Sequence, residues 1–151
     1  MNTYKTLLAF VLALNDLDTP LTQAEKNILG EIGDQLDAQP LAWESYTQPH
    51  LLKMITANPR LDQLYKTYQS QLNNTGDIPL ELLPTPAEIQ QLSNTSNFWA
   101  MKGFPPKSPP TGYDQQINNV VIVTSRSKQP ETAVKKLPWE KIKHFLNNQS
   151  N

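Results

Sequence analysis

Few residues in this sequence combine the types and the spacing that catalysis or metal binding requires. Asp16 and Asp18 form a carboxylate pair of the kind that binds metal ions, but they precede Thr19-Pro20 at the end of a predicted helix. Acidic residues in that position are more typical of a turn. The sequence has no cysteine and only two histidines, His50 and His144, which is too few for a histidine metal site within one chain. We therefore predict no metal and no other cofactor.

Sequence motifs of the common enzyme classes are not found either. The chain has no Walker loop, no dinucleotide-binding glycine pattern, no nucleophile elbow and no zinc-binding His/Glu helix. Gly30-Glu31-Ile32-Gly33 resembles the GxxG loop with which KH domains clamp a nucleic-acid backbone. That module needs flanking strands, and the apolar period continues through these glycines, so we expect close packing against the first helix instead. The sequence predicts a protein that is not an enzyme.

The elements that would position any site are predicted to surround the apolar run from Thr6 to Leu17. This run has no polar stripe on any helical face, so as a helix it must be covered on all sides. A signal peptide is the alternative, but its cleavage point would fall inside the run, which is also too short to span a bilayer. We predict a buried central helix, no transmembrane segment and a cytoplasmic protein.

Amphipathic helices are predicted to follow the central helix. A capping box at Thr22 and Glu25 begins one helix, in which apolar residues recur every three or four positions. Asn58, followed by a proline, begins another. Shorter helical segments fill the remaining stretches as far as the polar residues 93–97. Residues 1–97 are therefore predicted to form a small bundle of about five to six helices, several of them short.

Charge divides the chain into two unlike parts. Residues 1–97 carry five Lys or Arg and eleven Asp or Glu, a net charge of −6. Residues 98–151 carry eight Lys or Arg and three Asp or Glu, a net charge of +5. Such a split indicates an interaction rather than a particular fold. We therefore predict a helical bundle domain over 1–97 and a basic C-terminal segment over 98–151.

The basic C-terminal segment is predicted to contain several different elements. Residues 104–112 include four prolines and predict an extended linker. The Val- and Ile-rich residues 117–124 predict a β-strand, and 132–134 predict a weak return strand. Residues 138–148 predict an amphipathic terminal helix. The predicted fold class is therefore mainly α, with one or two β-strands between the bundle and the terminal helix.

We expect the basic C-terminal segment to dock on another protein, which makes the chain a non-enzymatic interaction, adaptor or regulatory module. A lone strand leaves its backbone groups unpaired, so 117–124 would pair with a second copy or with another protein's sheet. The terminal helix has the apolar spacing of a helix that enters a groove. An equally open alternative is that the segment folds back on the acidic domain. The predicted partner-binding residues are Trp139, Ile142, Leu146, Phe98, Trp99, Val121 and Val123.

A nucleic-acid-associated regulator is the alternative function. Lysines of the basic C-terminal segment would then bind phosphates, and salt would weaken the complex. Two observations oppose this reading. The bundle is acidic and would repel a polyanion, and only one of the eight basic residues after position 97 is arginine. The predicted phosphate-binding residues of this alternative are Lys128, Lys135, Lys136, Lys141 and Lys143.

Overall fold

Helices make up the secondary structure of the computed structural model, which describes residues 3–38, 43–75, 78, 82–83, 113–127, 129–137 and 139–149. The prediction of a mainly helical protein is confirmed for these residues, which contain no β-strand. We also find among them no helix with both the length and the hydrophobicity of a membrane span. The predicted linker over 104–112 falls outside the described residues.

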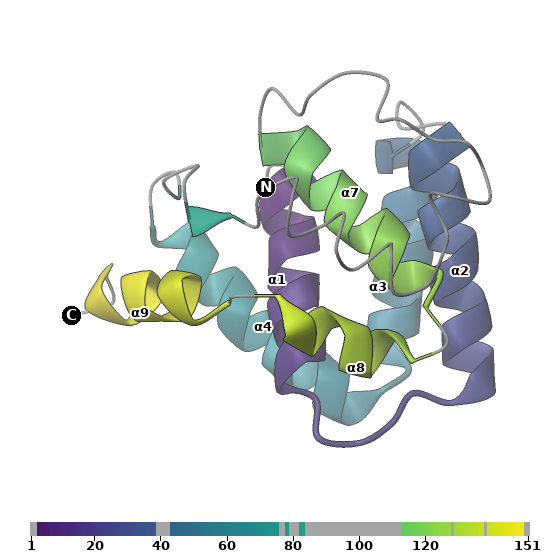
Figure 1. Cartoon of the computed structure of the whole chain (residues 1–151), viewed down its shortest axis with the longest axis horizontal. Coiled ribbons are helices and arrows are strands. Elements are labelled where there is room, and N and C mark those ends of the chain that lie inside the picture. The colour runs from purple at the N-terminus through teal and green to yellow at the C-terminus, as the bar shows by residue number, and fades with distance from the viewer. Residues whose placement is uncertain are drawn as a thin grey trace.

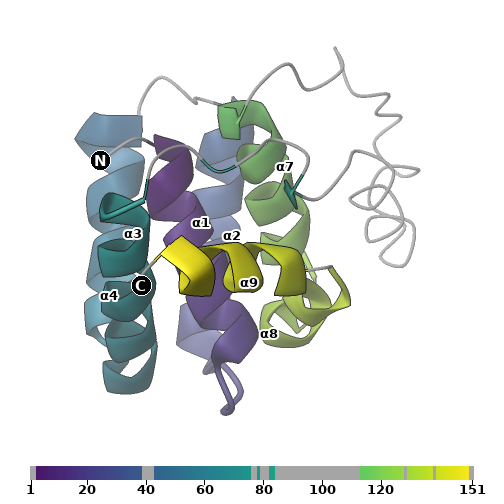
Figure 2. The same ribbon diagram turned by 90° about the vertical axis from the view of Figure 1, so that its left-hand side faces the viewer.

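α1 (Thr3–Asp16) is the central helix, and other helices pack on several of its sides (Figure 1, Figure 2). Its main neighbours are α4 (Pro59–Asn73) and α7 (Tyr113–Ser125). Every residue from Thr6 to Leu14 is buried, which confirms the buried apolar helix that the sequence predicts. Because all faces of α1 are covered, no polar stripe is needed on it.

α2 (Gln23–Ala38) begins at the predicted capping box. The Glu25 backbone N–H donates to Thr22 Oγ1 at 3.1 Å, and the Thr22 N–H donates to Glu25 Oε1 at 2.8 Å. Asn58 caps α4 as predicted, because its Oδ1 accepts from the Leu61 N–H at 3.2 Å. The Asn58 side-chain amide also donates to Glu25 Oε2 at 2.9 Å. This last bond links the starts of α2 and α4.

Two short elements separate α2 from α4. η2 (Trp43–Thr47) is a single π-helical turn, and α3 (Gln48–Thr56) follows it directly. Pro49 lies in the first turn of α3, where the missing N–H of proline costs no helical hydrogen bond. α3 buries Leu51 and Ile55 and packs against both α2 and α4.

α7 is the main correction to the sequence-based prediction. Residues 117–124, predicted as a strand, lie within this helix. Their Val and Ile side chains favour a strand by local preference, but a helix accepts β-branched residues where packing covers them. Ile117 and all residues from Val120 to Ser125 are buried. Self-association by strand pairing through 117–124 therefore has no basis in this structure.

The chain ends in three helical elements, α8 (Pro130–Ala133), η4 (Val134–Lys136) and α9 (Glu140–Gln149). The second predicted strand, 132–134, lies in α8 and η4 and is also corrected to helical structure. Pro130 begins α8, which favours a helical turn over a strand at this point. The predicted terminal helix is present as α9, which runs across the direction of α1 in both views (Figure 1, Figure 2).

One hydrophobic core joins the two predicted parts of the chain. It includes buried residues of α1, α2, α3 and α4, and also of α7, η4 and α9. At the contact between α2 and α7, a Cβ added to Gly33 would lie 1.8 Å from Ser125 Oγ. The sequence predicts this close packing but assigns it to the first helix, whereas the close neighbour is α7. The division at residue 97 cuts through this core, and independent folding of residues 1–97 stays a prediction.

A buried carboxylate attaches the loop between α1 and α2 to α8. Glu131 is 7% exposed, and its Oε2 accepts from the Leu21 backbone N–H at 3.0 Å. Leu21 is itself buried, so its N–H would lack a partner without this bond. A buried donor left unpaired costs about 1–3 kcal/mol, so Glu131 has a structural role.

Candidate interaction surface

The predicted anchor residues of the terminal helix are buried in the structure. Trp139, Ile142 and Leu146 expose 2% or less of their surface. Trp139 directly precedes α9, and its indole Nε1–H donates to the Val134 backbone carbonyl at 2.7 Å. The apolar spacing of these residues therefore reflects packing within the chain, which is the alternative that the sequence left open.

Of the other predicted partner-binding residues, the two that the structure describes are also buried. Val121 and Val123 of α7 are each 1% exposed, while Phe98 and Trp99 fall outside the described residues. Among the described residues, the large hydrophobic side chain that is exposed is Tyr46, at 57%. The five predicted anchors that the structure describes are thus all buried, and partner binding by these residues stays a prediction.

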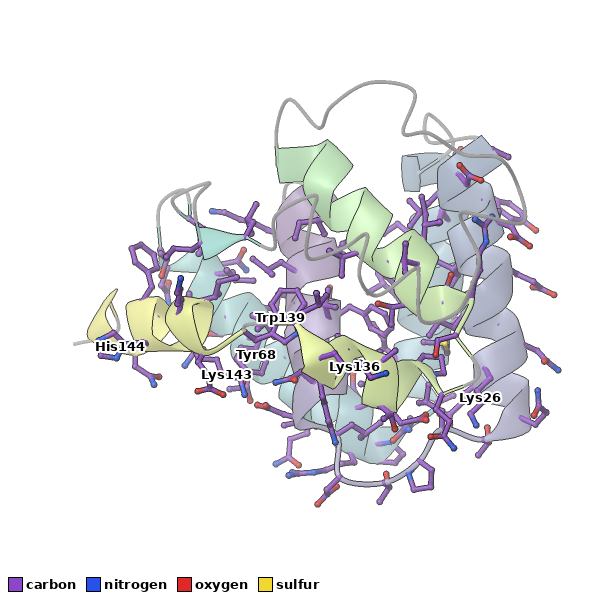
Figure 3. The ribbon with its side chains drawn as sticks, in the orientation of Figure 1. Lys26, Tyr68, Lys136, Trp139, Lys143 and His144 are labelled. Carbon is purple, nitrogen blue, oxygen red and sulfur yellow. The ribbon has the colours of Figure 1, made fainter. Side chains whose placement is uncertain are left out.

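Three of the predicted phosphate-binding lysines are exposed, and we call Lys135, Lys136 and Lys141 the lysine edge. The first two lie in η4, and the third lies in the first turn of α9. Figure 3 shows Lys136 beside the ribbon of α8. Lys135 Nζ also donates to the Leu17 backbone carbonyl at 3.2 Å. The three residues thus lie on either side of the junction between η4 and α9.

The remaining predicted lysines are placed differently. Lys128 falls outside the described residues. Lys143 pairs with Asp16 of α1. Its charge is therefore partly neutralised within the chain, and it does not belong to the lysine edge.

The arginine of the C-terminal segment binds the acidic part of the chain. Arg126 is the only arginine after residue 97, and its guanidinium lies 2.8 Å from Asp34 Oδ1 and 3.2 Å from Asp37 Oδ2. Asp34 and Asp37 both lie on α2. Together with the Lys143–Asp16 pair, these contacts place basic residues of the C-terminal segment against the acidic half. Some of the opposite charges of the two halves therefore pair with each other within the molecule.

Asp16, Tyr68 and Lys143 form a polar cluster that joins three helices, and we call it the clasp. Figure 3 labels Tyr68 and Lys143. Asp16 ends α1, Tyr68 lies on α4 and Lys143 lies on α9. The Tyr68 hydroxyl donates to Asp16 Oδ2, and Lys143 Nζ donates to Asp16 Oδ1. Burial raises the pKa of Tyr68, and the bond to Asp16 and the charges of Asp16 and Glu140 raise it further. Tyr68 is therefore a neutral hydrogen-bond donor at neutral pH.

Sequence reasoning missed the clasp because its members are far apart along the chain. Tyr68 lies 52 residues and Lys143 lies 127 residues from Asp16. One signal was available in the sequence. Asp16 places a negative charge at the C-terminal end of a helix, where the helix dipole disfavours it. A charge that is unfavourable within its own helix indicates that a residue from another element stabilises it.

The described residues do not assemble a recognisable catalytic centre. They contain no group of three or more His, Cys, Asp or Glu side chains that could hold a metal ion. His50 lies near one carboxylate, with its Nε2 3.7 Å from Glu31 Oε2, and its ring meets that of Tyr46 edge to face. In the clasp, the phenol and the ammonium both donate to the same carboxylate, so the three groups satisfy one another as a structural link.

Comparison with known proteins does not assign this chain to a family. No family model matches its sequence, and no solved structure matches it significantly. The function is therefore argued from its own residues.

Proposed function

We propose that this chain is a non-enzymatic protein-binding module whose basic C-terminal segment is the docking element. The observation that carries the proposal is the lysine edge. Its three lysines are exposed residues, and among the described residues none of them forms an ion pair with a carboxylate. Exposed charges of one sign favour and orient a partner of the opposite sign. The expected partner surface is therefore acidic.

This proposal uses different residues from those that the sequence suggested for the same segment. Trp139, Ile142 and Leu146 are buried in the core, so a partner that meets the chain in this conformation contacts the lysines instead. Contacts of exposed charges change the association rate and the salt dependence more than the affinity. We accordingly expect a moderate affinity that decreases as salt is added.

Nucleic acid is a less well supported partner for the same lysines. Arg126 is engaged with Asp34 and Asp37, and Lys143 is engaged with Asp16, so neither is free for phosphate. Three phosphate contacts give a salt slope of only about −2.7, which is about a fortyfold loss of affinity between roughly 50 and 200 mM salt. The acidic residues of the bundle would weaken this binding further.

The test is affinity capture followed by charge reversal. Full-length protein would be used to isolate bound species from an extract of the source cells, and each captured protein would be titrated in purified form. The double variant Lys136→Glu/Lys141→Glu should weaken binding of the true partner about tenfold or more, because it places like charges against an acidic surface.

The matched control is Lys53→Glu/Lys66→Glu, which makes the same change of net charge on α3 and α4, where both lysines are exposed. Equal binding by the two double variants would show that the lysine edge is not the docking element. Retention of the wild-type chain on single-stranded DNA, lost in Lys136→Glu/Lys141→Glu but kept in the control, would support the nucleic-acid alternative instead.

A further inference from the structure

The three residues of the lysine edge differ in what their ammonium groups contact. Lys135 Nζ donates to the backbone carbonyl of Leu17 at 3.2 Å, and Leu17 is buried. Leu17 follows the last residue of α1, and carbonyls at the end of a helix lack helical partners and carry partial negative charge. An ammonium is therefore favourable there. Among the described residues, the side chains of Lys136 and Lys141 form neither a hydrogen bond nor an ion pair.

A second polar contact holds the same turn of the chain. Glu131 lies four residues before Lys135, and its carboxylate accepts from the Leu21 backbone N–H at 3.0 Å. The carboxylate thus binds a backbone donor, and the ammonium binds a backbone acceptor, of the loop between α1 and α2. Two bonds of opposite polarity to one loop fix both the position and the orientation of α8 and η4.

Further hydrogen bonds extend this fixed geometry from η4 into α9. The Leu137 N–H donates to the Val134 carbonyl at 3.2 Å, and the Trp139 N–H donates to the Leu137 carbonyl at 3.1 Å. The Trp139 indole donates to the same Val134 carbonyl at 2.7 Å, and both Leu137 and Trp139 are buried. The chain's own fold therefore sets the separation of the backbone at Lys136 and Lys141.

We propose that Lys135 is a positioning residue, and that the lysine edge contacts an acidic peptide segment of its partner through two charges, Lys136 and Lys141. This inference rests on the proposed function, because it assigns separate roles within the docking element of that module. A docking element whose backbone is ordered before binding loses less conformational freedom in the complex. The bond from Lys135 to Leu17 supplies part of that order.

The charges around the lysine edge favour separated carboxylates over a continuous polyanion. Lysine is a compact point charge that suits a single carboxylate, whereas arginine offers the planar fork that matches phosphate. The arginine of the C-terminal segment, Arg126, is bound to Asp34 and Asp37. Glu140 is exposed directly before Lys141, and like charges placed against each other are unfavourable. A peptide in which acidic and uncharged residues alternate can avoid Glu140, while a chain of adjacent phosphates cannot.

The test measures binding of the full-length chain to a fluorescein-labelled peptide of alternating glutamate and serine at several salt concentrations. Lys136→Met and Lys141→Met should each weaken binding roughly two- to fivefold and lower its salt dependence by about half, because each removes one of two ion pairs. Lys53→Met, the control at an exposed position of α3, should change neither quantity.

Lys135→Met should behave differently from both contact variants. It should weaken binding roughly two- to tenfold with the salt dependence unchanged, since the two contact charges remain on a less ordered turn. Lys135→Arg should restore binding, because its guanidinium can donate to the same carbonyl. An equal decrease of salt dependence in all three methionine variants would overturn the separate roles, since all three lysines would then contact the peptide.

Hydrogen–deuterium exchange of the full-length chain tests the positioning role directly. Lys135→Met should speed exchange about tenfold in peptides that cover 130–139, because a charge-assisted hydrogen bond is lost, and leave exchange in α4 unchanged. Unchanged exchange in 130–139 would refute the positioning role.

Two results would refute the acidic peptide as the ligand. One is the absence of binding by wild type at low salt, and the other is stronger binding of single-stranded DNA than of the peptide at equal salt. Failure of the proposed function itself would appear separately, as insensitivity of the captured partner to Lys136→Glu/Lys141→Glu.

Discussion

Alanine substitutions at the two glycines of α2 should have opposite effects on stability. Both residues are helical, and alanine in place of glycine stabilises a helix interior by about 0.5–1 kcal/mol. At Gly30 an added Cβ would have its nearest neighbour, the Ser125 carbonyl oxygen, at 4.0 Å, which is ordinary van der Waals contact. Gly30→Ala should therefore raise the free energy of unfolding by roughly that amount.

Gly33 is different because α7 lies directly over it. The added Cβ would lie 1.8 Å from Ser125 Oγ and 2.8 Å from Ser125 Cβ. Rotating the hydroxyl would break its bond to the Ile122 carbonyl at 2.8 Å and would leave the contact with Cβ unrelieved. α2 and α7 must then separate, and overpacking of this kind costs about 1–3 kcal/mol. After the helix-propensity gain is subtracted, Gly33→Ala should lower the free energy of unfolding by about 1–2 kcal/mol.

Urea unfolding followed by circular dichroism measures both variants under identical conditions. In a chain of this size a loss of 1–2 kcal/mol corresponds to a decrease in Tm of about 3–6 °C. Ser125→Gly in the Gly33→Ala background should recover part of the loss, since it removes both crowded atoms. If Gly33→Ala is as stable as Gly30→Ala, the close contact between α2 and α7 does not exist as described and the packing argument fails.

Three further predictions concern Trp139, Tyr68 and the fragment 1–97. Trp139→Ala should lower the free energy of unfolding by about 3–5 kcal/mol, because the indole is buried, and a melt close to that of wild type would contradict its burial. The pKa of Tyr68 is raised above its ordinary value of 10.0, so its contribution to stability is complete below about pH 10 and decreases as the pH rises further. Between about pH 9 and 11, the free energy of unfolding measured in urea should therefore decrease less for Tyr68→Phe than for wild type. An equal decrease in the two proteins would refute the raised pKa of Tyr68. If the predicted domain boundary is right, the isolated fragment 1–97 melts cooperatively. Because the core is shared with the C-terminal segment, we expect a non-cooperative melt instead, and calorimetry of the fragment distinguishes the two outcomes.

The parts of the fold that the sequence predicts well are those with local signals. The capping box of Thr22 and Glu25 and the N-cap of Asn58 each depend on residues three positions apart, so the starts of α2 and α4 could be assigned from short stretches. The run from Thr6 to Leu14 is apolar on every helical face, which predicts its burial without knowledge of its neighbours.

Predictions failed or stayed incomplete where distant packing decides the structure. In α7 the local preference of Val and Ile for strands is overridden by burial against α1 and α2. At Trp139, Ile142 and Leu146 the sequence shows an apolar stripe but does not show what covers it. The clasp requires three elements to meet at one carboxylate, and the unfavourable position of Asp16 indicates only that a partner is needed.

The bond between Glu131 and Leu21 has a consequence for the biosynthesis of this protein. The two residues are 110 positions apart, so the ribosome adds the carboxylate long after the loop that needs it has emerged. At about 5–20 residues per second the delay is roughly 5–20 s, and α7 is delayed nearly as long relative to α1. During this interval the nascent chain displays the apolar surface of α1 without its later covering helices. The core of α1, α2, α4 and α7 can therefore close only once the last third of this sequence has been made.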